Sequence, residues 1–105
     1  ARAERIDEAV SELEKTLELK PDYLEAHLAL AVLFEMNGKF DDAAGHYEKA
    51  IRLDPANTKL YRQLGQLYFS MDKKEEALHQ YELLLKFDPD DVFAYIELSY
   101  VYVAS

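Results

Sequence analysis

The sequence predicts an all-α protein, an α-solenoid of six helices paired as antiparallel hairpins, and three observations lead to this prediction. Pro21, Pro55 and Pro89 stand 34 residues apart, a period that is typical of helical-hairpin repeats. Within each period, large apolar residues recur at i, i+3 and i+4, which is the spacing of one helix face. The 105 residues include only three glycines and three prolines, too few for the closely spaced turns of a β protein.

Alignment on the prolines defines the elements in order. It places residues 24–57 over 58–91 with eight identities, which include Leu30/Leu64, Leu33/Leu67, Ala43/Ala77 and Tyr47/Tyr81. A column of small residues in the first helices lets a second helix approach closely; its members are Ala31, Gly65 and Ser99. We predict a single array over 1–105, with the second helix of a partial repeat at 1–23, full repeats at 24–57 and 58–91, and the first helix of a partial repeat at 92–105.

Turn residues mark the helix boundaries. Each proline disfavours helical geometry in the residue before it, so the preceding helix ends there. Asn37-Gly38 and Asp72 hold equivalent places inside the two full repeats, and these residue types can adopt the left-handed conformation that ends a helix. We expect breaks near residues 21–23, 37–40, 55–57, 71–74 and 88–91. We expect N-caps at Asp22, Asn57 and Asp90 or Asp91.

The pattern resembles the tetratricopeptide repeat (TPR) family. Its signature is an aromatic residue, Leu-Gly and Tyr in the first helix, then Ala, an aromatic residue and Ala in the second, and a closing Pro. Residues 58–91 carry Tyr61, Leu64, Gly65, Tyr68, Ala77, Tyr81 and Pro89, with Leu84 in place of the last Ala. Residues 24–57 carry His27, Leu30, Ala31, Phe34, Ala43, Tyr47, Ala50 and Pro55. The resemblance implies a right-handed superhelix whose first helices line a concave, partner-binding face.

The family register implies which side chains face that surface. They are Glu25, Leu28, Val32, Glu35, Lys59, Arg62, Gln66 and Phe69, followed in the last helix by Phe93, Ile96, Tyr100 and Val103. Lys59 and Arg62 stand one turn apart. They either hold a carboxylate of the partner or neutralise Glu25 and Glu97, and both uses stay open.

Some TPR domains bind the C-terminal carboxylate of chaperones with a clamp of Lys, Asn and Arg residues. The corresponding positions of this sequence hold Leu28, Val32, Gln63, Phe93 and Glu97. We therefore expect no chaperone-tail clamp.

The last predicted helix is apolar nearly all round, and such a helix is normally covered on every side. We expect its stripe of Leu98, Val101 and Tyr102 to pack on the preceding helices. A partner or a second copy must then cover Phe93, Ile96, Tyr100 and Val103.

The first helix also lacks the helix it would normally pack against, and it presents Ile6, Ala9, Val10, Leu13 and Leu17. These surfaces predict a homo-oligomer, or a fragment of a longer repeat array.

Composition narrows the class of function. A formal net charge of −9 repels phosphate backbones, so we expect no nucleic-acid partner. No apolar run is long enough to span a bilayer, so we expect no membrane insertion. The chain has no cysteine and three scattered histidines, and we expect no catalytic, cofactor or metal site. His27 falls in the aromatic column, where a packing role is expected.

We therefore predict a non-enzymatic, cytoplasmic scaffold that binds a protein or peptide on its concave face. Two alternatives stay open. One is a self-assembling module whose half repeats pair between chains, and the other is a regulatory segment of a larger enzyme or secretion component.

Overall fold

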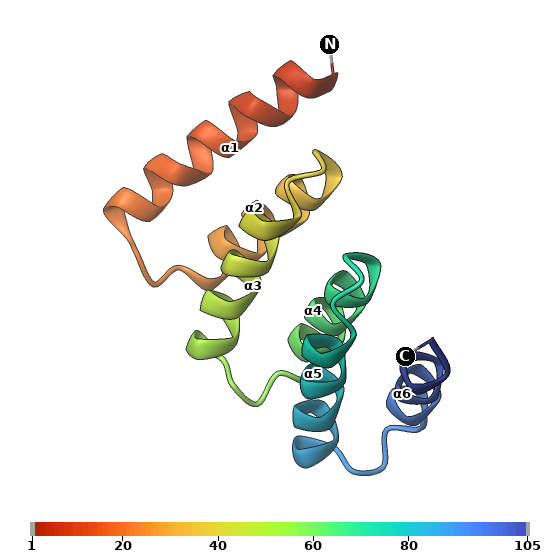
Figure 1. Ribbon diagram of the computed structural model, residues 1–105. Coiled ribbons are helices and arrows are strands. Elements are labelled where there is room, and N and C mark those ends of the chain that lie inside the picture. The colour runs from red at the N-terminus through yellow and green to blue at the C-terminus, as the bar shows by residue number, and fades with distance from the viewer. Residues whose placement is uncertain (1, 105) are drawn as a thin grey trace. The chain divides into compact units, whose positions relative to one another are not determined.

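The fold consists of helices joined by short loops (Figure 1). The computed structural model describes residues 2–104, with side chains from Glu4 onward, and no strand occurs within that range. The helices are α1 (Arg2–Leu19), α2 (Leu24–Met36), α3 (Phe40–Leu53), α4 (Thr58–Ser70), α5 (Lys74–Phe87) and α6 (Val92–Ala104). The predicted all-α class is confirmed, and every predicted break lies in a loop or within one residue of it.

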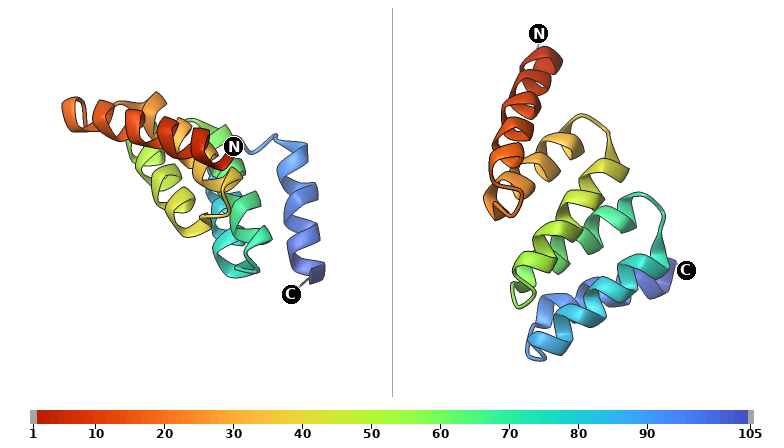
Figure 2. Two further views of the ribbon diagram at one scale, coloured as in Figure 1. Left: turned by 90° about the horizontal axis from the view of Figure 1, so that it is seen from above. Right: turned by 90° about the vertical axis from the view of Figure 1, so that its left-hand side faces the viewer.

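The helices form two compact units, residues 1–54 and 55–105. In the first unit, α2 and α3 form an antiparallel hairpin, and α1 packs on α2. In the second unit, α4 and α5 form the equivalent hairpin, and α6 packs on α5 (Figures 1 and 2). Each unit therefore contains one complete hairpin and one additional helix.

Each hairpin is closed by the same pattern of buried side chains. In the first unit these are Leu30, Ala31, Ala43, Tyr47 and Ala50, and in the second Leu64, Gly65, Ala77, Tyr81 and Leu84. In the second unit, the Tyr81 ring packs directly against Gly65 of the first helix. In the first unit, Ala31 and Tyr47 are buried at the equivalent positions. A small residue on the first helix leaves room for the second helix, which is the role expected of the small-residue column.

The first helix of each hairpin ends in a left-handed residue. Gly38 and Asp72 have φ angles of 75° and 62°. The N–H groups of the next residues, Lys39 and Lys73, each donate to a carbonyl five positions earlier at 2.8 Å. These bonds satisfy carbonyl groups that a helix end leaves open. The prediction that both positions end a helix is confirmed.

The helix N-termini follow the prediction in part. Asn57 caps α4 by accepting a hydrogen bond at 3.3 Å from a backbone N–H two residues on. Asp91 caps α6 by accepting one at 3.0 Å from a backbone N–H three residues on. The predicted cap at Asp22 is wrong. Helix α2 begins at Leu24, so Tyr23 occupies the N-cap position, and its side chain makes no capping bond.

In each of α2, α4 and α6, one side chain near the start of the helix is hydrogen-bonded to the loop that precedes it. The bonds join His27 Nε2 to the Pro21 carbonyl at 2.8 Å, the Tyr61 hydroxyl to Pro55 at 2.6 Å, and the Tyr95 hydroxyl to Pro89 at 3.0 Å. The same contact thus recurs with the 34-residue period. Histidine takes the place of tyrosine in the first unit, where its ring is buried.

The outer helices, α1 and α6, are covered unequally. Ile6 is buried because α1 packs on α2, so the apolar stripe of α1 is less open than predicted. On α6 only Ala94 and Val101 are buried among the described residues. Tyr102 was expected to pack on the preceding helices, but it is 58% exposed. The reason is that α6 packs on α5 through the side that carries Ala94 and Val101.

Candidate protein-interaction surface

The predicted partner-binding residues lie on three helices. In the first unit, α2 carries Glu25, Leu28, Val32 and Glu35. In the second unit, α4 carries Lys59, Arg62, Gln66 and Phe69, and α6 carries Phe93, Ile96, Tyr100 and Val103. Hydrogen bonds join α4 directly to α6, so the second unit brings two of these three groups together.

Arg62 is the centre of an ion-pair network in the second unit. Its Nε donates to Glu97 Oε1 at 2.8 Å, and its terminal nitrogen donates to Asp91 Oδ2 at 2.7 Å. Gln66 Nε2 and the Tyr81 hydroxyl donate to the other Glu97 oxygen, at 2.9 and 3.1 Å. The network therefore ties α6 to both α4 and α5.

The charges of this network are largely shielded from water. The side chains of Arg62, Asp91 and Glu97 are 25%, 13% and 20% exposed. Their hydrogen bond raises the pKa of Arg62 and lowers the pKa of Asp91. Burial raises the pKa of Tyr81, and the charge of Glu97 adds to the rise. Arg62 thus neutralises carboxylates of its own unit, and two of them already occupy its guanidinium group.

In the first unit, Glu35 is likewise engaged internally. The Tyr47 hydroxyl donates to Glu35 Oε1 at 3.0 Å. Burial raises the pKa of Tyr47, and the bond to Glu35 adds to the rise. The other predicted residues of α2 remain accessible, because Glu25 and Val32 are exposed and Leu28 is half-buried.

Apolar side chains are exposed beside the Arg62 network. The exposed fractions are 37% for Phe69, 68% for Phe93, 48% for Ile96 and 64% for Tyr100. We call Arg62, Gln66, Phe69, Phe93, Ile96 and Tyr100 the α4/α6 face. It combines polar groups that are already held by internal bonds with large apolar groups that face water, and exposed apolar patches of this kind mark interaction sites.

A polar pair lies inside the first hairpin. His27 Nδ1 and His46 Nδ1 are 3.1 Å apart. Because His27 donates through Nε2 to Pro21, its Nδ1 accepts from His46 when both rings are neutral. Burial lowers the pKa of His46; His27 and Lys49 strengthen this effect, whereas Asp42 opposes it. The bond between α2 and α3 therefore requires at least one neutral ring.

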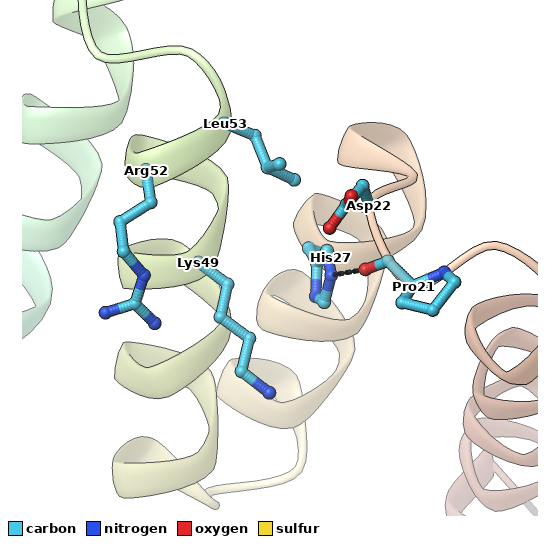
Figure 3. A pocket seen from close by; sticks show the side chains of 6 residues that line it. All are labelled: Pro21, Asp22, His27, Lys49, Arg52 and Leu53. Carbon is cyan, nitrogen blue, oxygen red and sulfur yellow. Dashed lines mark hydrogen bonds between the residues drawn. The ribbon is translucent and has the colours of Figure 1, made fainter.

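A cleft of about 320 Å³ opens beside this pair (Figure 3), lined by Pro21, Asp22, His27, Lys49, Arg52 and Leu53. In the second unit, the positions equivalent to His27 and Leu53 hold Tyr61 and Phe87, whose rings stack with centroids 5.8 Å apart. The smaller side chains of the first unit leave this space open. The cleft is therefore a consequence of local packing.

Two partners were missed by sequence reasoning. Asp91 is expected only as an N-cap, yet it caps α6 with Oδ1 and binds Arg62 with Oδ2. His46 is not expected to meet His27, although His27 stands in the aromatic column of its helix and His46 directly precedes the aromatic Tyr47 of the next helix. Within residues 2–104, no group of three His, Asp or Glu side chains is placed to hold a metal ion. None of the helices in the same range combines the length and apolar character that crossing a bilayer requires.

Comparisons with known proteins agree with this geometry. Two family models described as tetratricopeptide repeat match residues 1–58 and 35–98. No curated protein matches the chain. Among solved structures, a crystal structure of MamA is 25% identical, with a TM-score of 0.84, and the match covers 94% of this chain and 58% of that one.

Two further structures are similar. The first TPR of Spaghetti (RPAP3), bound to the HSP90 peptide SRMEEVD, is 27% identical with a TM-score of 0.79, and the match covers 98% of this chain and 82% of that one. A thermophilic TPR protein of Thermus thermophilus is 26% identical with a TM-score of 0.78, over 93% of this chain and 50% of that one. The chain spans little more than half the length of the MamA structures. It belongs to the tetratricopeptide repeat family.

Proposed function

We propose that this chain is a protein-interaction module whose α4/α6 face binds a peptide segment with apolar side chains. The observation that carries the proposal is the exposure of Phe69, Phe93, Ile96 and Tyr100 beside a polar network that is satisfied within the unit. Side chains held in place before binding lose little conformational freedom when a partner docks. The apolar groups provide the surface that a partner would remove from water.

Charge favours a partner with basic residues beside its apolar ones. The net charge of −9 attracts a cationic segment and accelerates the encounter. An acidic chain terminus is a poor candidate, because Arg62 is already paired with two carboxylates. The RPAP3 domain is bound to the acidic peptide SRMEEVD. At positions where the chaperone-tail clamp needs cations, this chain has Phe93 and Glu97.

In the first unit, α2 offers a smaller surface of the same type. Val32 is 44% exposed and Met36 51% exposed, with Leu28 half-buried beside them. We propose that α2 makes a second contact to the same class of partner, and that Glu25 interacts there with basic residues of the peptide.

A selection experiment tests the proposal. Peptides from a random library are enriched on the immobilised chain, and the site of a selected peptide is mapped by NMR shifts of the backbone amides. We expect enrichment of peptides that combine apolar and basic residues, with shifts concentrated in α4 and α6. Absence of enrichment, or shifts confined to α3 and α5, would contradict the proposal.

A further inference from the structure

The cleft of the first unit combines open space with charged side chains. Lys49, Arg52 and Leu53 line it from α3, and Pro21, Asp22 and His27 line it from α2 and the loop before it (Figure 3). We call this space the first-unit cleft. Its volume of about 320 Å³ lies within the range of ligand-binding clefts, about 300–1,000 Å³. Local packing leaves the cleft open, and its lining decides what it can hold.

The lining is more positive than the chain as a whole. Lys49 and Arg52 contribute two cations, and Asp22 contributes one carboxylate, whereas the whole chain has a formal net charge of −9. Within residues 4–104, neither Lys49 nor Arg52 forms an ion pair with a carboxylate. Arg62, in contrast, is paired with two. Both cations of the cleft can therefore interact with an anion from outside the chain.

The equivalent region of the second unit has neither the space nor the second cation. The stacked rings of Tyr61 and Phe87 occupy it, and the position equivalent to Lys49 holds Leu83. Hairpin packing requires neither feature, because the second hairpin forms without them. The open space and the second cation occur together in the first unit.

The end of a helix explains only one of the two cations. Arg52 and its equivalent Lys86 both lie in the last turn of their helices, where a cation stabilises the helix dipole. Lys49 lies one turn earlier and lines the cleft together with the buried ring of His27. That ring is held in place before any ligand binds, because both of its nitrogens are hydrogen-bonded.

We propose that the first-unit cleft binds a phosphate group. Arg52 and Lys49 donate charge-assisted hydrogen bonds to the phosphate oxygens, and Asp22 accepts a hydrogen bond from the P–O–H group. Both cations have long, exposed side chains that can turn toward a ligand. The cleft lies apart from the α4/α6 face in the fold, so this inference does not depend on the proposed function.

A protonated phosphate matches both walls of the cleft. The cations line the α3 side, and Asp22 lies on the opposite side, beside His27 (Figure 3). A phosphate monoester has a second pKa of about 6, so about half of the groups carry a proton near that pH. Sulfate offers similar oxygens but no proton at that pH, and it would leave the Asp22 carboxylate without a donor. The carboxylate therefore selects phosphate over sulfate.

NMR shifts of the backbone amides, recorded at pH 6 during a titration with inorganic phosphate, test the site. We expect shifts that saturate and that are concentrated at the two walls of the cleft. Sodium sulfate at the same ionic strength should bind at least about fivefold more weakly, because a buried or partly buried acceptor that loses its donor costs binding free energy.

Leu53→Phe is the sharpest variant because it retains both cations and fills the space in the way that Phe87 does in the second unit. We expect it to abolish the saturable shifts. Lys49→Leu introduces the residue of the equivalent position and should weaken phosphate binding about tenfold. Lys86→Ala is the matched control. It removes a cation from the last turn of α5, beside the filled region of the second unit, and should bind like the wild type.

Phosphoserine with blocked termini distinguishes two sources of the group. Tighter binding of inorganic phosphate identifies the free ion as the ligand, and tighter binding of phosphoserine identifies a modified partner; both results support a phosphate site. Equal, unsaturated shifts with phosphate and sulfate would mean an adventitious ion only and would overturn the proposal. Phosphate binding by Leu53→Phe at the wild-type affinity would also overturn it, because the cations alone would then suffice.

Discussion

Tyr81 packs its ring against the backbone of Gly65, and a Cβ atom added at Gly65 would lie 3.0 Å from Cζ of that ring. The hydroxyl of the same tyrosine is bonded to Glu97. The ring therefore cannot shift away without weakening the network that ties α6 to the hairpin. The contact that closes the α4–α5 hairpin also positions a carboxylate beside the α4/α6 face.

Gly65→Leu should destabilise the protein because the added side chain has no room beside Tyr81. Overpacking of this kind lowers the free energy of unfolding by about 1–3 kcal/mol, which shifts the melting midpoint down by several degrees. Gly45→Ala is the control within a helix. A Cβ atom at Gly45 meets nothing within 4 Å, so this change should stabilise by up to about 1 kcal/mol. An unchanged midpoint in Gly65→Leu would show that the packing is looser than described.

Asp72→Gly should stabilise the second unit. Among residues 2–104, Asp72 is the one non-glycine residue with a positive φ, and glycine adopts that conformation without steric strain. We expect a gain of about 1 kcal/mol in urea unfolding. The ion pair of Asp72 with Lys74 is lost, but its carboxyl side chain is 86% exposed and such pairs contribute little. Gly38→Ala, at the equivalent turn, should have the opposite sign; a loss of stability in Asp72→Gly would contradict the argument.

Stability should fall as the pH is lowered through the titration of His46. Burial lowers the folded-state pKa of His46 below its ordinary value of 6.5, so the unfolded chain binds the proton more tightly. The stabilisation that comes from neutral His46 is present above pH 6.5, decreases as the pH falls below that value, and is lost once the pH passes below the folded-state pKa of His46. His46→Gln, which places the residue of the equivalent position Gln80, should flatten the pH dependence of the urea midpoint. His79→Gln, at an exposed histidine, should retain the wild-type slope.

Arg62→Ala should loosen α6 without unfolding the first unit. The change leaves Asp91 and Glu97 close together without their shared cation, and we expect a loss of about 2 kcal/mol. Hydrogen exchange should accelerate in α6 and remain unchanged in α2 and α3. Lys59→Ala removes an exposed cation of the same helix and should leave the exchange of α6 unaltered. Equal rates in the wild type and Arg62→Ala would mean that the network does not hold α6.

The fold could be predicted because its determinants are periodic. Proline spacing, the small-residue column and the turn residues Gly38 and Asp72 each repeat with the helical hairpin, so they support one another. The Arg62 network could be predicted only in part. The family register left the pairing of Arg62 with Glu97 open as one of two uses of Arg62, and the structure contains that pair. The repeat could not decide between the two uses, because the positions equivalent to Glu97 in the two full repeats hold Ala29 and Gln63. The bond of Arg62 to Asp91 occurs once, between distant residues, and no repeated position indicates it.

Titration calorimetry with a library-selected peptide tests the central claim most directly. Tyr100→Glu changes the α4/α6 face, and Phe40→Glu changes an exposed aromatic residue at the start of α3. The wild-type side chains of Tyr100 and Phe40 are 64% and 41% exposed. Circular dichroism should show the same helix content in both variants. The account predicts that Tyr100→Glu weakens peptide binding by about tenfold or more, whereas Phe40→Glu binds like the wild type. Equal affinities for the wild type and Tyr100→Glu, or a loss confined to Phe40→Glu, would contradict it.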